Sequence, residues 1–233
     1  MIRTRFVCSF SMLFLTLLLL LSGPSWAREP AKSGSYTYFQ ALTGDDSDSD
    51  KSRWDSLYSK HKGYVFGKEP VAFLVENHMI LPVGQALDIA MGEGRNAVYL
   101  AKKGFQVVGV DISEVAVKKA KRLARENKVN IRTVTTDLNK YQIEPAKYDV
   151  IMIFYYLQRS LPPAVIKGLK PGGMLIFESH TVDQLKHDKT QNRDYLLAKG
   201  ELKAMFKDLE IVKYRESDDG KNAVASLVAR KRK

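Results

Sequence analysis

The stretch Gln85-Ala-Leu-Asp-Ile-Ala-Met-Gly-Glu-Gly-Arg-Asn-Ala-Val-Tyr-Leu100 predicts a buried strand, a glycine turn and a helix, and the rest of the chain is arranged around it. Gly92 and Gly94 let the backbone approach a ligand closely, because a side chain there would block the approach. The helix predicted to start at Arg95 points its unpaired amides and positive dipole end at the same spot. An anionic or phosphate-like ligand is expected; the alternative is a tight turn with no ligand.

Length and composition indicate one globular domain with attachments, since the chain has 233 residues and is 45% hydrophobic. The formal charge of +11 is spread along the chain and includes the terminal run Arg230 to Lys233, expected to be a frayed tail. No segment interleaves basic and aromatic residues, so no nucleic-acid partner is expected. Cys8 is the only cysteine and lies in the leader, which excludes disulfides and cysteine chemistry from the mature domain; no metal site is predicted.

The N-terminus has the pattern of an export signal over residues 1–27. Arg3 and Arg5 precede an apolar run from Phe6 to Leu21, and small residues at Ser25 and Ala27 indicate cleavage after Ala27. The alternative is an uncleaved membrane anchor, because the run is only slightly shorter than the ~20 residues of a spanning helix. The basic flank favours an exported domain in either case, periplasmic or secreted if the leader is cleaved and membrane-anchored if it is not.

A polar linker is predicted over residues 28–52, followed by the folded domain over residues 53–233. The linker is most polar at Gly44 to Asp50, where a calcium loop is the less favoured alternative because the central glycine and terminal glutamate of an EF-hand are missing. Residues 53–84 are expected to form a cover section. It contains a short helix at Trp54 to Tyr58, an aromatic turn, and a helix whose first turn includes Pro70.

Helices alternating with apolar strands predict an α/β fold, a doubly wound, mostly parallel seven-stranded sheet of Rossmann-like type. After the opening stretch we expect strands at 105–110, 130–135, 148–154 and 174–178 and helices at 113–127, 162–169 and 202–206. Lys170 to Gly173 is predicted to be a turn. The strands at 209–215 and 223–229 are expected to form an antiparallel hairpin at the C-terminus. The basic helix face from Lys118 to Lys128 is expected to be exposed to solvent.

Acidic residues follow two strands at the edge where ligands bind in such sheets. Asp111, after the second strand, is placed to accept hydrogen bonds from ribose hydroxyls; the alternative role of helix cap suits Ser113 better. Asp137 and Leu138, after the third strand, are placed to hold an adenine, the alternative being a turn. Gly92, Gly94 and Ala97 also satisfy the GxGxxA dinucleotide pattern. The acid Asp88 in the preceding strand and the cover section argue against a dehydrogenase.

Five motifs in order resemble the class I S-adenosylmethionine-dependent methyltransferases, from about Trp54 to the C-terminus. They are Ala-Leu-Asp-Ile-Ala-Met-Gly-Glu-Gly-Arg-Asn96, Val-Asp-Ile-Ser113, Thr-Asp-Leu138, Tyr-Asp-Val150 and Leu-Lys-Pro-Gly-Gly173. The similarity is closest to the small-molecule branch that includes the tellurite-resistance methyltransferases, where Gly-Glu-Gly-Arg-Asn-Ala-Val-Tyr-Leu is characteristic.

The resemblance implies a role for each matching residue. The turn from Ala90 to Gly94 would cradle the methionine part of S-adenosylmethionine, with Asp88 supporting it, and Arg95 would start the helix that faces the methionine carboxylate. Asp111 would hold the ribose, with Ile112 in the same cofactor-binding group. The remaining roles fall to the adenine contacts Asp137 and Leu138 and to Phe154, whose carbonyl would accept from the methionine amino group. The family often has glycine at the position of Ala90.

Residues near the reacting methyl are predicted to come from the ends of the fourth and fifth strands. Tyr155, Tyr156 and Arg159 follow the fourth strand, and His180 follows the fifth on a loop; His180 would be a base or an anion contact, or else a surface residue. Arg95, Arg159 and Arg193 would favour an anionic substrate if they are not simply solvated. A sulfur, selenium or tellurium nucleophile needs no general base, whereas an oxygen or nitrogen nucleophile often does.

The expected function is methyl transfer to a small molecule, possible acceptors being a thiol or a selenium or tellurium oxyanion. The expected state is a monomer or homodimer that meets a membrane only through an uncleaved N-terminal segment. Two alternatives are a cofactor-binding module without catalysis and a nicotinamide-dependent oxidoreductase. Export is a difficulty for the methyltransferase interpretation, because S-adenosylmethionine is made in the cytosol.

Overall fold

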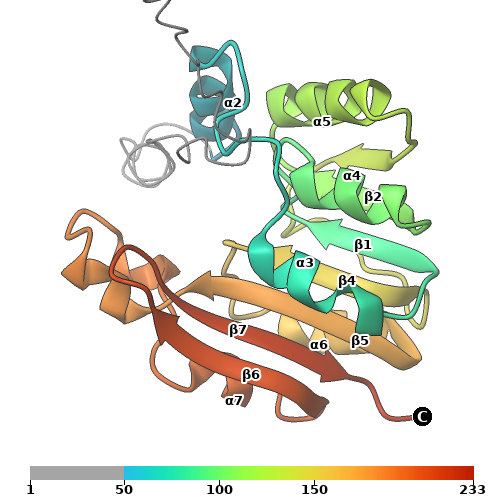
Figure 1. Cartoon of the computed structure of the whole chain (residues 1–233), viewed down its shortest axis with the longest axis vertical. Helices are drawn as coiled ribbons and strands as arrows, with labels where there is room; N and C mark the ends of the chain where they lie inside the picture. The colour runs from blue at the N-terminus through green and yellow to red at the C-terminus, as the bar shows by residue number, and fades with distance from the viewer. Residues whose placement is uncertain (1–49) are drawn as a thin grey trace, which may run out of the picture. The chain divides into compact units, whose positions relative to one another are not determined.

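The computed structural model describes residues 50–233, which form a seven-stranded sheet in the order β3-β2-β1-β4-β5-β7-β6 (Figure 1). The strands are β1 (Gln85–Ile89), β2 (Gln106–Asp111), β3 (Arg132–Thr135), β4 (Tyr148–Phe154), β5 (Leu169–His180), β6 (Glu210–Asp218) and β7 (Ala223–Arg230). The α-helices are α2 (Asp50–Lys60), α3 (Ala72–Asn77), α4 (Arg95–Lys102), α5 (Glu114–Glu126), α6 (Pro162–Gly168) and α7 (Glu201–Met205). Short 3-10 helices are η1 (His78–Ile80), η2 (Val182–Lys186) and η3 (Arg193–Tyr195).

The sheet is parallel except at β7, which runs antiparallel to both of its neighbours, β5 and β6. This arrangement confirms the predicted fold class and the C-terminal hairpin. The chain moves outward from β1 to β2 and β3, and then crosses back to place β4 on the other side of β1. Because ligands bind at the carboxyl ends of the strands where the order reverses, the expected site lies at the ends of β1 and β4.

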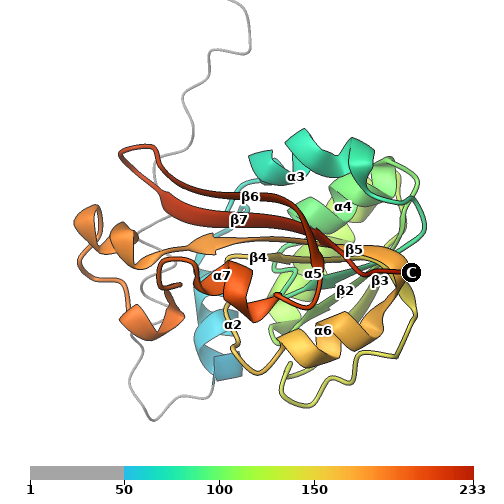
Figure 2. The same cartoon turned by 90° about the horizontal axis from the view of Figure 1, so that it is seen from below.

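Helices cover both faces of the sheet, with α3 and α4 on one side and α6 and α7 on the other (Figure 2). The strand residues alternate between two cores. Ala86 and Met152 pack in the core under α3 and α4, whereas Leu87 and Ile151 pack in the core that includes residues of α6 and α7. Since β4 is covered on both faces, its sequence is almost wholly apolar, as the prediction required.

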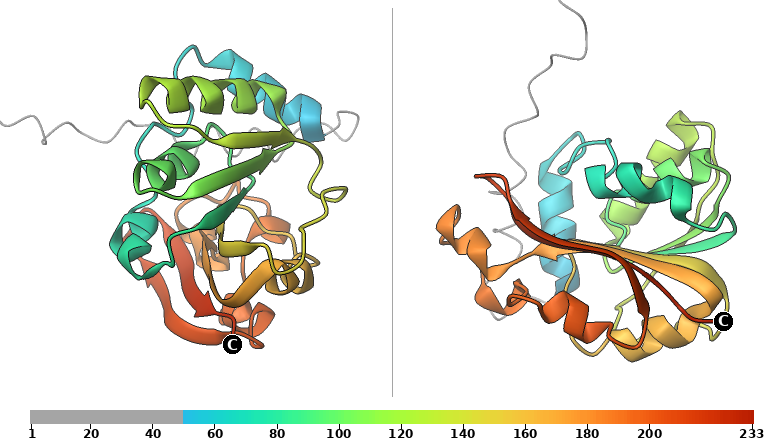
Figure 3. Two further views of the ribbon diagram at one scale, coloured as in Figure 1. Left: turned by 90° about the vertical axis from the view of Figure 1, so that its right-hand side faces the viewer. Right: turned by 60° about the horizontal axis from the view of Figure 1, so that its bottom comes forward.

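The cover section packs over the glycine turn and α5. Helix α2 contacts α5, and the two lie side by side in Figures 1 and 3. Helix α2 begins at Asp50, inside the segment predicted as linker (28–52), so residues 50–52 are helical rather than linker. Pro70 precedes Val71, the N-cap of α3, and so lies outside the first turn predicted for it. The predicted leader and the rest of the linker, residues 1–49, lie outside the described residues.

The C-terminal run is more ordered than predicted, and it changes the assignment of a turn. Lys231 is not frayed: its amide donates to the carbonyl of Gly173, and its carbonyl accepts from Gly172 N–H, both at 2.8 Å. Its ammonium also donates to the carbonyls of Ile166 and Leu169. Lys170 to Gly173 therefore belong to β5 instead of forming a separate turn. Within residues 50–233, no helix has both the length and the apolar character to cross a membrane.

Candidate functional site

The loop after β1 has the left-handed backbone that its glycines permit. Its φ angles are 56° at Ala90, 56° at Gly92 and 83° at Gly94, the N-cap of α4. A side chain at Gly94 would lie 2.7 Å from Cβ of Ala120, so α5 packs directly on the loop. Ala90 adopts this conformation in spite of its methyl group, which costs about 1–2 kcal/mol. The loop is therefore a half-buried turn of backbone held by its packing, as expected for a ligand cradle.

Asp111 links this loop to the end of β2. Its Oδ2 accepts from Gly92 N–H and its Oδ1 from Ser113 N–H, each at 2.8 Å. Ser113 itself caps α5 by accepting from Ala116 N–H, as predicted. Burial raises the pKa of Asp111 to about 6, although the Ser113 and Gly92 amides oppose this effect. A carboxylate held so firmly beside the loop is a ready acceptor for ligand hydroxyls.

Asp88 is the second buried acid of this edge. It is 1% exposed, and its Oδ2 has no hydrogen-bond partner in the described part of the chain. Burial, followed by the charge of Asp111, raises the pKa of Asp88 well above its ordinary value. An orphaned buried oxygen close to the loop is a group that a ligand or a bound water would satisfy.

Asp137 and Leu138 lie next to Asp111. Thr136 N–H donates to the carbonyl of Asp111, which brings the ends of β2 and β3 together. Asp137 Oδ1 accepts from Asn139 N–H at 2.9 Å, so the residue also forms the turn of the alternative interpretation, and Leu138 is buried in the core. Ile112, between Asp111 and the helix cap, is half-buried. The structure thus gathers the residues predicted for ribose and adenine at one corner.

Tyr155 and Tyr156 are adjacent but belong to different parts of the site. Tyr156 packs on the core cluster that includes Leu138, and burial and then the charge of Asp137 raise its pKa to about 12. Tyr155 packs instead with the core of α3 and α4, which includes Phe154, the last residue of β4. The prediction grouped both tyrosines at the acceptor, whereas the structure places Tyr156 toward the adenosine corner.

Tyr155 is held by two contacts to Glu178 on β5. Its backbone has a φ of 57°, a rare value for a bulky residue that often marks a functional site. Its amide donates to the Glu178 carbonyl at 2.8 Å, and its hydroxyl donates to Glu178 Oε1 at 3.1 Å. Burial and the Glu178 charge raise the pKa of Tyr155 above its ordinary value. The tyrosine therefore stays a neutral hydrogen-bond donor at neutral pH.

Glu178 and Ser226 are candidate site residues, linked to Tyr155 by hydrogen bonds, that the sequence analysis missed. Glu178 is 5% exposed, and its Oε2 accepts from the Ser226 hydroxyl at 2.6 Å. Burial raises the pKa of Glu178 above its ordinary value. A buried acid in an apolar strand is the only sequence signal for this position; Ser226 needs the register of β5 with β7, which pairs the two residues.

His180 is the last residue of β5, not a loop residue as predicted. Its ring lies 5.0 Å from the ring of Tyr155, centroid to centroid, and burial lowers its pKa, so the imidazole is neutral at pH 7. The structure therefore brings His180 together with Tyr155 at the ends of β4 and β5.

The three arginines predicted to attract an anionic substrate have other surroundings. Arg159 pairs with Glu201 at 2.6 Å and donates to the carbonyls of Asp194 and Leu196, so it fixes the segment before α7. Arg95 donates to the carbonyl of Phe66 at 2.8 Å. Arg193 is exposed at the start of η3.

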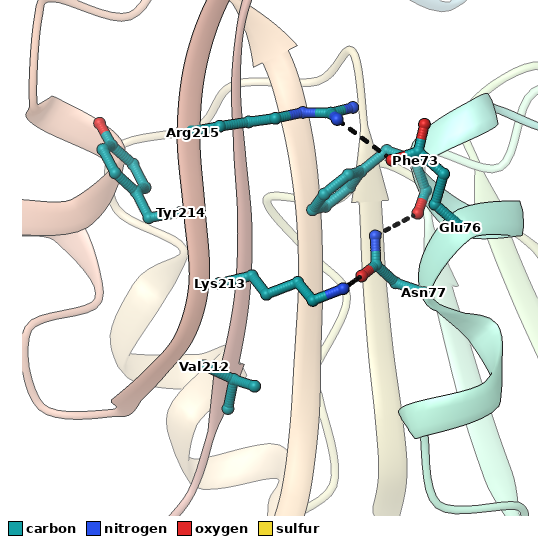
Figure 4. A pocket seen from close by; sticks show the side chains of 7 residues that line it. All are labelled: Phe73, Glu76, Asn77, Val212, Lys213, Tyr214 and Arg215. Atoms are coloured by element: carbon teal, nitrogen blue, oxygen red, sulfur yellow. Dashed lines mark hydrogen bonds and ion pairs between the residues drawn. The ribbon is translucent and has the colours of Figure 1, made fainter.

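A pocket of about 390 Å³ opens between α3 and β6, away from the glycine loop. Figure 4 shows Lys213 and Arg215 reaching toward α3, where they contact Asn77 at 2.6 Å and Glu76 at 3.1 Å. The lining residues are Phe73, Glu76, Asn77, Val212, Lys213, Tyr214 and Arg215. None of the predicted site residues is among them, so this pocket is not the candidate site.

The strand order, the reversed β7, the glycine loop and the acids at the ends of β1 and β2 define the class I methyltransferase fold, as the sequence resemblance implied. Solved structures agree. TehB from Haemophilus influenzae has a TM-score of 0.60 at 24% identity, covering 77% of this chain and 67% of that one. A SAM-dependent methyltransferase from Methanosarcina mazei has a TM-score of 0.57 at 20% identity, covering 70% of this chain and 99% of that one.

The chain belongs to the TehB family, because the family described as "Tellurite resistance protein TehB" matches residues 58–222. A relative from Haemophilus influenzae strain Rd, named a probable S-adenosyl-L-methionine-dependent methyltransferase TehB, is 28% identical over 178 residues, or 68% of this chain. The chain spans 61% of the length of that relative. A ubiquinone biosynthesis O-methyltransferase of Coxiella burnetii is 31% identical over 110 residues, covering 45% of this chain and 47% of the relative.

Proposed function

We propose that this protein transfers the methyl group of S-adenosylmethionine to a small-molecule acceptor. The observation that carries the proposal is Asp111, a buried carboxylate at the end of β2 that is tied to the amide of Gly92 in the glycine loop. The names of the TehB relatives support the same cofactor.

The residues present fit this cofactor. The loop from Ala90 to Gly94 offers left-handed backbone tied to Asp111, and Asp88 Oδ2 in the preceding strand has no hydrogen-bond partner in the described residues. We assign Asp111 to the ribose hydroxyls and Asp137 to the adenine amino group, because both acids follow strands at the ligand-binding edge of the sheet. Bound there, the cofactor would supply an activated methyl on a sulfonium sulfur, which the acceptor attacks in line as the carbon–sulfur bond breaks and its electron pair passes to sulfur.

The acceptor side of the site favours a nucleophile that needs no deprotonation. Because the pKa of Tyr155 is raised, its hydroxyl keeps its proton at neutral pH and cannot accept another, and both Glu178 carboxylate oxygens already accept hydrogen bonds. His180 is neutral but lies against the Tyr155 ring. We therefore propose as acceptor a selenium or tellurium oxyanion, or a thiol that attacks as the thiolate already formed by proton loss to water, because neither needs a general base from the protein. The protein then mainly has to align the reactants and exclude water.

Calorimetric titration of the protein with S-adenosylmethionine, S-adenosylhomocysteine and NAD tests the cofactor. We expect binding of the first two and none of NAD; binding of NAD alone would sink the proposal. Methyl transfer to thiols, selenite and tellurite is then measured with labelled cofactor. Tight binding without transfer to any acceptor would favour a cofactor-binding module over an enzyme.

We also propose that the domain is exported, with residues 1–27 as a leader or an anchor. The support is the sequence pattern alone: a basic start, an apolar run and small residues before Ala27. Mass spectrometry of the protein from its native host would locate the mature N-terminus. A start at Arg28 is the expected result, and an intact Met1 in a membrane fraction would instead indicate the anchor.

A further inference from the structure

Glu93, between the two loop glycines, turns away from the expected ligand and into the protein. It is 4% exposed, and its Oε2 accepts from Val65 N–H at 2.7 Å and Phe66 N–H at 3.4 Å. Its Oε1 accepts from Lys119 Nζ at 2.9 Å. The carboxylate of Glu93 therefore binds the cover section and does not face the ligand site.

Lys119 completes the contact from the other side. The prediction placed it on a solvent-exposed basic face, but it is 9% exposed, because its ammonium is drawn into a ring of acceptors. Besides Glu93, it donates to the carbonyls of Tyr58, His61 and Gly63 at 2.8, 2.9 and 2.7 Å. An ammonium has three N–H donors, so these four acceptors leave none of its N–H groups without a partner.

Two more residues of the loop motif bind the same part of the chain. Arg95 donates to the Phe66 carbonyl at 2.8 Å, and Asn96 Oδ1 accepts from Val71 N–H at 2.9 Å. Every one of these contacts on the cover section is to a backbone atom. Residues 58–66, here called the front segment, are thus fastened to the glycine loop at several points.

The contacts of Glu93 and Lys119 with the front segment place one of its side chains over the glycine loop. The hydroxyl of Tyr58 lies 3.0 Å from the position that a Cβ on Gly92 would take. Tyr58 is 4% exposed, and its ring stacks on Trp54 and meets the edge of Phe66. The carbonyl of the same residue is one of the acceptors of Lys119, so the ammonium fixes the tyrosine at its backbone.

A buried ion pair does not usually add stability, because desolvating two charges offsets most of their attraction. Five backbone groups of the front segment depend on this pair: three carbonyls on Lys119 and two amides on Glu93. We infer that Glu93 and Lys119 are positioning residues that hold Tyr58 and the front segment over Gly92, and thereby shape the methionine end of the cofactor site. This inference rests on the proposed function.

The inference predicts a loss of affinity that depends on the ligand's tail. S-Adenosylhomocysteine carries the amino-acid tail that would lie at Gly92, whereas 5′-methylthioadenosine keeps the adenosine and lacks that tail. For Lys119→Met we expect calorimetry of the full chain to show affinity for S-adenosylhomocysteine lowered about tenfold or more, and that for 5′-methylthioadenosine lowered less than about threefold. Exposed Lys118→Met is the matched control and should change neither.

A second variant guards against loss of folding. Lys119→Met leaves Glu93 buried and unpaired, whereas the double variant Glu93→Gln with Lys119→Met removes both charges and keeps an acceptor for Val65 N–H. Equal losses for both ligands, or a folded double variant with unchanged affinity for S-adenosylhomocysteine, would overturn the inference. Failure of the wild type to bind any adenosine ligand would instead overturn the proposed function.

Hydrogen exchange of the ligand-free protein provides a readout without cofactor. In a variant that combines Glu93→Ala with Lys119→Met, which removes the acceptor of both amides, Val65 and Phe66 N–H should exchange at least about tenfold faster than in the wild type, with the amides of β4 unchanged. Unchanged protection of Val65 and Phe66 would show that Glu93 and Lys119 do not hold the front segment, and the inference would be wrong.

Discussion

The adenosine corner and the acceptor corner of this site are built in different ways. At the adenosine corner, Asp111 and Gly92 lie 19 positions apart and belong to consecutive strand–helix units. At the acceptor corner, Tyr155 meets Glu178 from 23 positions away, and Glu178 meets Ser226 from 48. The first corner follows from local order along the chain, whereas the second depends on how β5 pairs with the reversed β7. If the proposed function holds, we therefore expect substitutions to change cofactor binding and acceptor choice separately.

The largest effect that would break the adenosine corner is expected from Gly94→Ala. The new methyl would lie 2.7 Å from Ala120 Cβ, at a φ of 83°. Backbone strain and overpacking together should lower the free energy of unfolding by about 3 kcal/mol. Gly104→Ala is the matched control: its φ is 90° but the space around it is open, so strain alone should cost about 1 kcal/mol. Urea unfolding measures both, and equal losses would mean that α5 does not press on the loop.

The next effect separates the two acids of the adenosine corner. Asp111→Asn removes the charge that strengthens the hydrogen bonds to ribose, and its NH2 group leaves either Gly92 N–H or Ser113 N–H without an acceptor, so affinity for S-adenosylhomocysteine should fall about 100-fold. Asp137→Asn, at a half-buried position with a turn role of its own, should cost no more than about tenfold. Calorimetry compares them; unchanged affinity in Asp111→Asn would show that this acid is only structural.

Because burial raises the pKa of Asp111 to about 6, cofactor affinity should depend on pH in a range where an ordinary aspartate would not titrate. Ribose hydroxyls donate to the charged form, so protons compete with the ligand, and affinity should rise about tenfold from pH 5 to pH 7. The charge of Asp55, a neighbouring acid, also raises the pKa of Asp111 and acts in the same direction. Titration of Asp111→Asn over the same range should be flat, and a slope as steep as that of the wild type would assign the effect to another group.

This difference between the corners also explains what could be predicted from the sequence. The strand β1, the helix start at Arg95 and the cap at Ser113 follow local rules, and all three were predicted correctly. Lys119 was misplaced because its helix face is basic, and the acceptors that bury its ammonium are Glu93 and three carbonyls of the cover section, at residues 58, 61 and 63. Glu178 was overlooked because its partners, Tyr155 and Ser226, are far from it in the sequence.

The smallest expected effect tests the acceptor corner alone. Tyr155→Phe removes the hydroxyl that donates to Glu178 Oε1. It keeps the ring beside His180 and the hydrogen bond from the backbone N–H of residue 155 to the Glu178 carbonyl. A lost hydrogen bond to a charged group, partly offset by the remaining contacts, should lower kcat/KM for the acceptor about fivefold, equivalent to about 1 kcal/mol. Affinity for S-adenosylhomocysteine should stay unchanged, because this hydroxyl donates to Glu178 on β5, on the acceptor side of the site. A matched loss in cofactor affinity would show instead that Tyr155 joins the two corners, and the separation drawn between them would not hold.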